Sequence, residues 1–192
     1  NYFQSSIVGI LKHDLDHENE AVQIFLPSGP LAILPLSNNR SSFVWTMKNN
    51  EAERRLKLDD QMFLNEMNCA FQNRRGKIEL EDKKYSFPIS LALSQKIIKE
   101  KFAIIGDTAH KIHPIAGQGL NLGIRDVAAL AEILILARRL GEDIGSKMVL
   151  KRYERWRNLD ILSVVLFTDF ANKIFSSENY ILQFFRGFGF KF

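Results

Sequence analysis

The chain has 192 residues, enough for one or two domains, and 46% of them are hydrophobic, so a buried core is expected and disorder is not. The formal net charge of +4 is mild and gives no reason to expect a nucleic-acid partner. No apolar run reaches the ~18 residues that a membrane-spanning helix needs. The single cysteine, Cys69, cannot form an internal disulfide and suits a reducing compartment.

The first half of the chain alternates between short apolar runs and turn residues, as strands joined by hairpins do. Turn residues such as Pro27-Ser28-Gly29-Pro30 separate these runs. Apolar positions among charges predict one helix from Glu51 to Met67. Strands are predicted over residues 5–11, 21–26, 31–36, 42–47, 78–80 and 85–93.

Three features of this half admit both a structural and a functional interpretation. Residues 13–20 are rich in Asp, Glu and His but lack a defined ligand spacing, so a solvated loop is preferred to a metal site. Asn73 to Lys77 is a basic turn, for which a solvated loop is preferred to a nucleic-acid patch. Cys69 is expected to be a small buried residue on a helix rather than a catalytic thiol.

The segment from residue 102 to 123 is the most informative part of the chain. Its first residues, Phe102-Ala103-Ile104-Ile105, form an apolar run that stops at Gly106, as a buried strand does. Asp107 follows directly, at the carboxyl end of the predicted strand. A carboxylate in this place can reach a hydroxyl group of a ligand.

A loop and a long helix follow the predicted strand. The loop contains Pro114, Gly117 and Gly119, and its small residues let the backbone approach a ligand closely. A helical pattern then runs from about Gln118 to Gly141. The loop and the helix start therefore offer unpaired N–H groups and the positive end of a helix to a ligand.

This segment resembles the second flavin-binding motif of the class A flavoprotein aromatic hydroxylases, the para-hydroxybenzoate hydroxylase type. Within that family it is most similar to the ubiquinone-biosynthesis branch. The pair Gly-Asp alone would be a weak signal, whereas here the whole motif matches in order. The matching residues read Gly106-Asp107-x-Ala109-His110-x-x-His113-Pro114-x-Ala116-Gly117-Gln118-Gly119-x-Asn121-Leu122-Gly123.

The resemblance implies how these residues meet FAD. It gives Asp107, next to Gly106, the role of accepting a hydrogen bond from a ribityl hydroxyl, and it places Pro114 beside the isoalloxazine. Fixed N–H dipoles at the helix start stabilise the negative charge of reduced flavin near N1 and the C2 carbonyl. No side chain is a convincing acid or base, so no catalytic residue is predicted. The backbone expected near the pyrimidine end of the ring is that of Gly117, Gln118, Gly119, Leu120 and Asn121.

The resemblance also implies a fold and two domains. Residues 1–100 resemble the family's substrate domain, whose sheet roofs the flavin, and residues 101–192 resemble the carboxyl-terminal part of the FAD-binding domain. The predicted fold class is α/β (α+β), para-hydroxybenzoate-hydroxylase-like, with an antiparallel or mixed sheet followed by strands and helices. The fingerprint G-x-G-x-x-G is absent from the sequence. We therefore expect the family's amino-terminal Rossmann half to be missing and this part alone to be inactive.

The strands of the first part carry further similarity. Residues 27–36 and Val44-Trp45-Thr46 match the ubiquinone branch, and one face of the sheet is expected to line an apolar pocket. Trp45 is the residue that we predict to contact the substrate there. Packing in the core is an equally good interpretation of Trp45.

Two long helices are expected after the motif, over residues 120–140 and 147–170. Tyr153-Glu154-Arg155-x-Arg157 matches a family element that is structural rather than catalytic, and His110 and His113 are expected to shape the loop. The Phe-rich tail, residues 170–192, has two interpretations. It packs against the missing flavin domain, or it contacts a membrane surface or a partner.

The resemblance implies an FAD-dependent monooxygenase. NAD(P)H reduces the flavin, oxygen reacts with it, and one oxygen atom passes to the aromatic ring of a polyprenyl-phenol precursor of ubiquinone. The expected partners are this polyprenyl aromatic substrate and the missing amino-terminal half, with a ubiquinone-biosynthesis complex or a membrane surface as a further contact. A cytoplasmic location is expected, with peripheral attachment to the inner membrane surface as the alternative.

Two other functions stay open. The absent fingerprint also suits a non-catalytic remnant or partner subunit of a split flavoprotein. A flavin hydroxylase that acts on a soluble aromatic compound is the third possibility, and a polar pocket would favour it.

Overall fold

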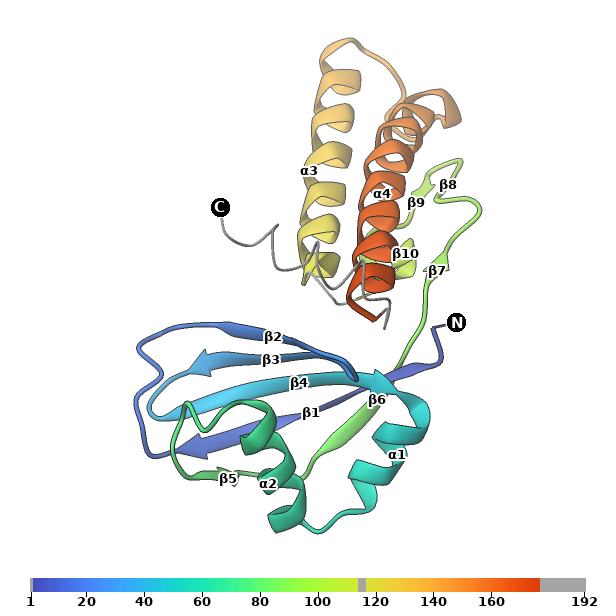
Figure 1. The fold of residues 1–192 in the computed structure, drawn as a ribbon. Helices are drawn as coiled ribbons and strands as arrows, with labels where there is room; N and C mark the ends of the chain where they lie inside the picture. Colours follow the sequence, from blue (N-terminus) through green and yellow to red (C-terminus); the bar gives the residue numbers. More distant parts are fainter. Residues whose placement is uncertain (1, 114–116, 177–192) are drawn as a thin grey trace. The chain divides into compact units, whose positions relative to one another are not determined.

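The computed structural model describes residues 2–113 and 117–176, and Figure 1 shows the path of the chain. Two compact units follow one another and separate between Ile89 and Ser90. Residues 2–89 belong to the first unit and residues 90–172 to the second. The roles expected for residues 1–100 and 101–192, in substrate binding and in flavin binding, stay predictions.

The first unit is built on an antiparallel sheet of six strands. The strand order is β2-β3-β4-β1-β5, and β6 also pairs with β1. Direct cross-strand partners fix the register, because Trp45 on β4 lies opposite Ile7 on one side and Leu31 on the other. The strands are β1 (Gln4–His13), β2 (Val22–Leu26), β3 (Gly29–Leu36), β4 (Arg40–Lys48), β5 (Ile78–Leu80) and β6 (Tyr85–Ile89).

Two helices, α1 (Asn49–Lys57) and α2 (Asp60–Ala70), connect β4 to β5. The single helix predicted from Glu51 to Met67 is therefore wrong. The helix breaks because Asp59 has an extended backbone and caps α2, its side chain accepting a hydrogen bond from the backbone N–H of Met62 at 2.7 Å. Asp is among the best N-cap residues, so a cap inside an otherwise helical pattern ends one helix and starts another.

The core of the first unit lies between the sheet and these helices, which cover the same face (Figure 1). Side chains alternate along each strand, so one face of β4 points to the helices and the other points away. Phe43 and Trp45 are on the helix-facing side and pack with Phe63 of α2. Val44, between them in sequence, lies on the opposite face and is half-buried.

Two expectations for the first unit need correction. Cys69, expected to be buried, is exposed on α2 because the buried face of that helix is formed by Phe63, Leu64 and Met67. The segment expected to be a solvated loop contains two buried histidines, His13 and His17. Both rings are held by hydrogen bonds, His13 with Ser41 and His17 with backbone carbonyls.

The second unit consists of short strand pairs and two long helices. The strand β7 (Ala92–Leu93) pairs with β10 (His110–Lys111), and β8 (Ile98–Lys99) pairs with β9 (Phe102–Ala103). A 3-10 turn, Gly106–Thr108, follows β9. The helices α3 (Gln118–Arg139) and α4 (Lys147–Ser176) occupy the positions predicted from the sequence, and α4 continues beyond the predicted end at residue 170.

The buried strand predicted over residues 102–105 is wrong in this unit. Only Phe102 and Ala103 form a strand, Phe102 is 54% exposed and Ile105 is 39% exposed. Among the described residues only β8 pairs with β9, and the run packs against the core of this unit through Ala103 and Ile104.

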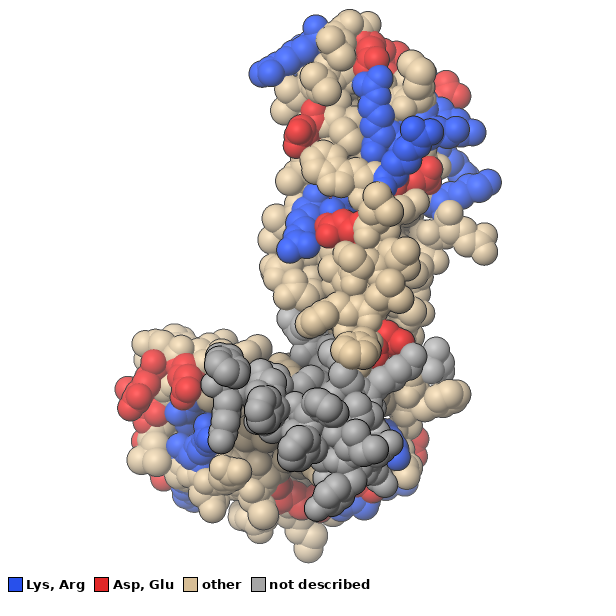
Figure 2. Space-filling view, turned by 45° about the horizontal axis from the view of Figure 1, so that its top comes forward, with Lys and Arg blue, Asp and Glu red and all other residues tan. Residues whose placement is uncertain are grey.

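Positive side chains gather where α3 ends and α4 begins (Figure 2). Arg138 and Arg139 lie in the last turn of α3, where they complement the negative end of the helix dipole. The first turn of α3, at the other end of a 22-residue helix, is ~33 Å away. This basic end therefore does not adjoin the predicted flavin loop.

The carboxyl-terminal tail was predicted from residues 170–192. Residues 177–192 lie outside the described part of the chain, and Phe170 is exposed. Among the helices that the structure describes, none is long and apolar enough to cross a membrane.

Gly29, at the start of β3, is expected to tolerate no side chain. Its φ is +132°, and a Cβ built on its backbone would lie 2.2 Å from the carbonyl oxygen of Thr46. Gly29→Ala should lower the free energy of unfolding by ~3 kcal/mol, because backbone strain and overpacking act together. Denaturant unfolding measures this change, with Ser28→Ala as the neighbouring control. Equal stability of the two variants would contradict the expectation.

Candidate functional site

The predicted ligand loop lies between β9 and α3. Gly106 has a φ of +62°, a left-handed conformation that glycine adopts without strain and that turns the chain sharply after the strand. Asp107 is exposed in the following 3-10 turn. At the other end of the loop, Gly117 has a φ of 60° and begins α3 without a side-chain cap. The first N–H groups of α3 therefore need partners from outside the helix.

Two glycines on α3, Gly119 and Gly123, face this turn. A Cβ built at Gly119 would be 3.9 Å from Oδ1 of Asp107, and one built at Gly123 would be 3.4 Å from Cα of Gly106. Glycines four residues apart share one helix face. The structure thus brings the Asp107 carboxylate and the first turn of α3 together, while their contact with a ligand stays a prediction.

The other predicted site residues are placed as follows. Leu120 is 76% exposed and Asn121 is exposed, with its Nδ2 donating to Oε1 of Gln118 at 3.4 Å. Gly117 is exposed as well, and no atom of the described residues would lie within 4 Å of a Cβ there. Pro114 lies outside the described residues. Among the described residues, the side chains at the helix start are therefore mostly exposed.

Trp45 belongs to the first unit and lies in its core. Its side chain is 1% exposed, between Phe63 and the guanidinium of Arg55, which lies 4.6 Å from the ring centroid. Its indole N–H has no hydrogen-bond partner among the described residues. Core packing accounts for this placement, and contact with a substrate stays a prediction.

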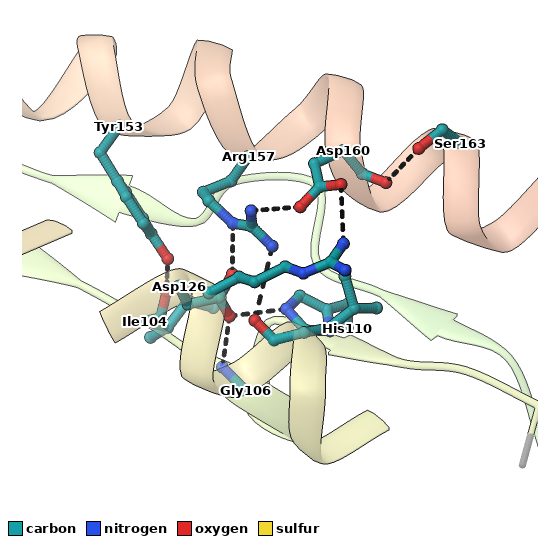
Figure 3. Close-up of polar contacts among 10 residues, drawn as sticks. Ile104, Gly106, His110, Asp126, Tyr153, Arg157, Asp160 and Ser163 are labelled. Carbon is teal, nitrogen blue, oxygen red and sulfur yellow. Dashed lines mark hydrogen bonds and ion pairs between the residues drawn. The ribbon is translucent and has the colours of Figure 1, made fainter. Parts of the chain in front are cut away.

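A buried carboxylate behind the loop was not predicted as a site residue. Asp126 of α3 is 0% exposed, and its Oδ2 accepts the backbone N–H of Gly106 at 2.7 Å (Figure 3). The same oxygen lies 2.6 Å from Nε2 of His110. Because a carboxylate only accepts hydrogen bonds, Nε2 carries the proton and donates. Asp126 therefore ties the glycine turn and β10 to α3.

The other oxygen of Asp126 is bound from α4. Arg157, 2% exposed, donates from Nε to Oδ1 of Asp126 at 2.6 Å and from a terminal nitrogen to Asp160 at 2.5 Å. Arg125, which precedes Asp126 in the sequence, pairs with Asp160 as well, at 3.3 Å. Figure 3 shows these side chains converging between the two helices. The predicted structural role of Arg157 thus has a specific form, an ion pair with Asp126.

Tyr153 adds a second tie from α4 to the strand before the loop. Its hydroxyl donates to the carbonyl oxygen of Ile104 at 3.1 Å, and its side chain is fully buried. Burial raises the pKa of the Tyr153 hydroxyl, and the charge of Asp126 raises it further. Tyr153 therefore stays a neutral hydrogen-bond donor in the folded protein.

One sequence signal could have revealed Asp126. Gly119, Gly123 and Asp126 are spaced by four and three residues, so they line one face of α3. Two glycines on a helix face indicate that backbone approaches there, and an acidic residue next on the same face can receive its N–H groups. The sequence does not show that Arg157 and His110 complete the site.

The arrangement can bind a ligand that carries hydroxyl groups and negative charge. An exposed carboxylate at Asp107 accepts hydrogen bonds from hydroxyls, and N–H groups at the start of a helix donate to anionic or carbonyl oxygens. Among the described residues there is no group of three His, Cys, Asp or Glu side chains that could hold a metal ion.

Comparison with known proteins identifies the group to which the chain is related. The sequence model described as "FAD binding domain" matches residues 4–167, most of the chain. The chain belongs to this FAD-binding domain family. The family predicted from the motif around Asp107 is thereby confirmed, and FAD is the cofactor of the family.

Two relatives are a ubiquinone hydroxylase and a ubiquinone-biosynthesis monooxygenase. The chain is 39% identical to "Ubiquinone hydroxylase UbiL" of Rhodospirillum rubrum, over 92% of this chain and 41% of the relative. It is 32% identical to "Ubiquinone biosynthesis monooxygenase COQ6, mitochondrial" of Danio rerio, over 98% of this chain and 46% of the relative. The chain thus spans less than half the length of either relative.

Solved structures confirm the predicted fold class. The structure of pqsL, a probable FAD-dependent monooxygenase from Pseudomonas aeruginosa, matches with a TM-score of 0.76 at 21% identity, over 97% of this chain and 51% of that one. The Klebsiella pneumoniae R204Q HpxO complexed with FAD matches with a TM-score of 0.69 at 17% identity, over 95% of this chain and 48% of that one.

The residues of this chain around Gly106 and the start of α3 fit the part of FAD that carries the ribityl hydroxyls and the ring. The glycine turns at Gly106 and Gly117 leave room for a bulky group on the side of the described residues, since none of their atoms would lie within 4 Å of a Cβ at either position. Asp107 supplies an acceptor for hydroxyls, and the start of α3 supplies donors. The G-x-G-x-x-G loop that holds a dinucleotide diphosphate is absent from the sequence.

His113 should make the stability of the second unit depend on pH. Its side chain is fully buried, and burial lowers its pKa from 6.5 to about 4, although the charge of Asp169 opposes this shift. The unfolded chain therefore binds a proton more readily than the folded one, and stability falls as the pH drops from 6.5 towards 4. The expected contribution of this residue is of order 3 kcal/mol.

His113→Gln should remove this part of the pH dependence. Unfolding free energies of both proteins are measured between about pH 7 and pH 4. All other titratable groups are shared, so the difference between the two curves isolates His113. Parallel curves would show that His113 does not cause the acid sensitivity.

Proposed function

We propose that the chain is part of an FAD-dependent monooxygenase that hydroxylates the aromatic ring of a polyprenyl-phenol precursor of ubiquinone. The similarity to UbiL and COQ6, at 39% and 32% identity over more than nine-tenths of the chain, carries this proposal. NAD(P)H is the proposed reductant. A polyprenyl substrate resides in the bilayer, which favours peripheral contact with a membrane surface.

FAD, when bound, supplies the redox and oxygen chemistry. The chain supplies position and electrostatic field. The Asp107 carboxylate accepts a hydrogen bond from a ribityl hydroxyl, and the N–H groups at the start of α3 face the pyrimidine end of the isoalloxazine. Because these dipoles are fixed before the reaction, they stabilise negative charge without reorganising. Pro114 is proposed to lie beside the ring.

The sheet of the first unit offers a substrate surface on the side away from α1 and α2. Val8 and Val44 are direct cross-strand partners on that face and are half-buried. Tyr85, opposite Val8, and Phe87, opposite Ser6, extend the face with side chains that are 51% and 58% exposed. An apolar, partly aromatic face of this kind suits a prenylated phenol. Trp45 lies on the other face, so these residues are better placed to line the substrate.

A non-catalytic partner subunit is the second candidate function. The absence of the G-x-G-x-x-G fingerprint from the sequence motivates it. The absorbance spectrum of the purified chain after incubation with FAD separates the candidates. Bound flavin, with the chain alone or together with the part of UbiL that the chain does not match, supports the hydroxylase. No bound flavin in either case supports the partner subunit.

Asp107→Ala should weaken FAD binding by about tenfold or more, because a hydrogen bond to a charged acceptor is lost. Flavin fluorescence quenching in a titration measures the affinity. Glu132→Ala is the matched control, since Glu132 is an exposed carboxylate on α3 away from the helix start. Equal affinities of the Asp107 and Glu132 variants would rule out the assigned role of Asp107.

A further inference from the structure

We infer that Asp126 is a positioning residue that orients the Asp107 carboxylate towards the flavin and couples the flavin loop to α4. This inference rests on the proposed function, because it assumes that Asp107 faces FAD. The contacts of Asp126, rather than the motif, carry it. Asp126 does not touch the proposed flavin position and would act only through the glycine turn.

The first step is that Asp126 holds three separate segments at once. Its carboxylate accepts the backbone N–H of Gly106, the ring N–H of His110 and the guanidinium of Arg157, at 2.6–2.7 Å. These donors come from the glycine turn, from β10 and from α4. Both carboxylate oxygens are thus in use, and no donor can be lost without leaving buried charge poorly paired.

The second step is that the bond to Gly106 controls the residue next to it. The N–H of Gly106 is fixed to Asp126, and the left-handed φ of Gly106 then sets the direction in which Asp107 leaves the turn. Oδ1 of Asp107 consequently lies 3.9 Å from the Cβ position of Gly119, beside the first turn of α3. If Gly106 were released, the side chain of Asp107 could point in other directions. The Asp107 carboxylate would then no longer be held in place to accept a hydrogen bond from a hydroxyl.

The third step is that Arg157 links this turn to α4. Asp126 and Arg157 are both nearly inaccessible to solvent, at 0% and 2% exposure, so water does not screen their ion pair. Arg152, also on α4, forms a contrasting pair at the surface. It binds Glu142, which lies between α3 and α4, through two contacts of 2.7 Å. Only the buried pair connects to the glycine turn, so only the buried pair should affect flavin binding.

The central test uses Asp126→Asn with Glu142→Gln as its matched control. Both substitutions turn a carboxylate that binds an arginine of α4 into an amide. Asp126→Asn should raise the FAD dissociation constant by about tenfold and speed hydrogen exchange of the Gly106 amide by about tenfold, since one charge-assisted hydrogen bond is lost. Glu142→Gln should change neither. The circular dichroism signal of the helices, followed on heating, identifies the temperature range in which both variants are folded.

A double-mutant cycle separates positioning from general destabilisation. If Asp126 acts through Asp107, then Asp126→Asn should weaken FAD binding in the wild-type background but not in Asp107→Ala. Additive effects of the two substitutions, or unchanged FAD affinity and Gly106 exchange in Asp126→Asn, would overturn the inference. Lumichrome is an alloxazine that lacks the ribityl chain which Asp107 is proposed to contact. It should therefore bind the Asp126→Asn variant and the wild type equally.

The failure of the proposed function would give a different result. If the wild-type chain binds no FAD, either alone or together with the part of UbiL that it does not match, the proposed cofactor role fails, while hydrogen exchange of Gly106 in Asp126→Asn still tests the positioning contact. If Asp126→Asn does not fold, Arg157→Lys replaces it, because this variant keeps the positive charge but loses the fixed Nε donor. It should weaken FAD binding about threefold and speed Gly106 exchange, and no change in either would overturn the coupling to α4.

Discussion

The burial of the Asp126 carboxylate is the constraint on which the second unit depends. A carboxylate at 0% exposure is very costly unless donors surround it, and here the donors are Gly106, His110 and Arg157. Each belongs to a different segment of the chain. The charge is therefore satisfied only when the glycine turn, β10 and α4 have all reached their places around α3, which makes the assembly of this unit cooperative.

Much of the fold was predictable from local patterns. The hairpin strands and the two long helices follow from alternation and helical periodicity, and the structure contains them. The helix predicted from Glu51 to Met67 failed because Asp59 caps a new helix inside a continuous pattern. The strand predicted over residues 102–105 failed because burial depends on neighbouring strands, which a single apolar run does not specify. Local signals thus predicted whether a segment is helix or strand better than they predicted where it ends or how deeply it is buried.

The candidate site was predictable only where its residues are close in sequence. Asp107 and Gly119 belong to one motif, and the structure places them next to each other. Asp126 and Arg157 are separated by 31 positions on two helices, and no local pattern specifies which acidic residue meets which arginine. Arg125 illustrates the difficulty, because it is adjacent to Asp126 in sequence and yet pairs with Asp160. Tertiary packing decides such pairings, so they had to come from the structure.

The glycines on α3 limit how far this protein can be stabilised by redesign. Glycine costs ~1 kcal/mol relative to alanine inside a helix, so Gly119 and Gly123 are the positions that a consensus or computational design would replace first. Alanine fits sterically at both, at 3.9 Å from Asp107 and 3.4 Å from Gly106. The added methyl groups would nevertheless occupy the narrow space between helix and turn. A more heat-resistant variant obtained in this way would gain helix strength and lose space beside the Asp107 carboxylate and the Gly106 turn.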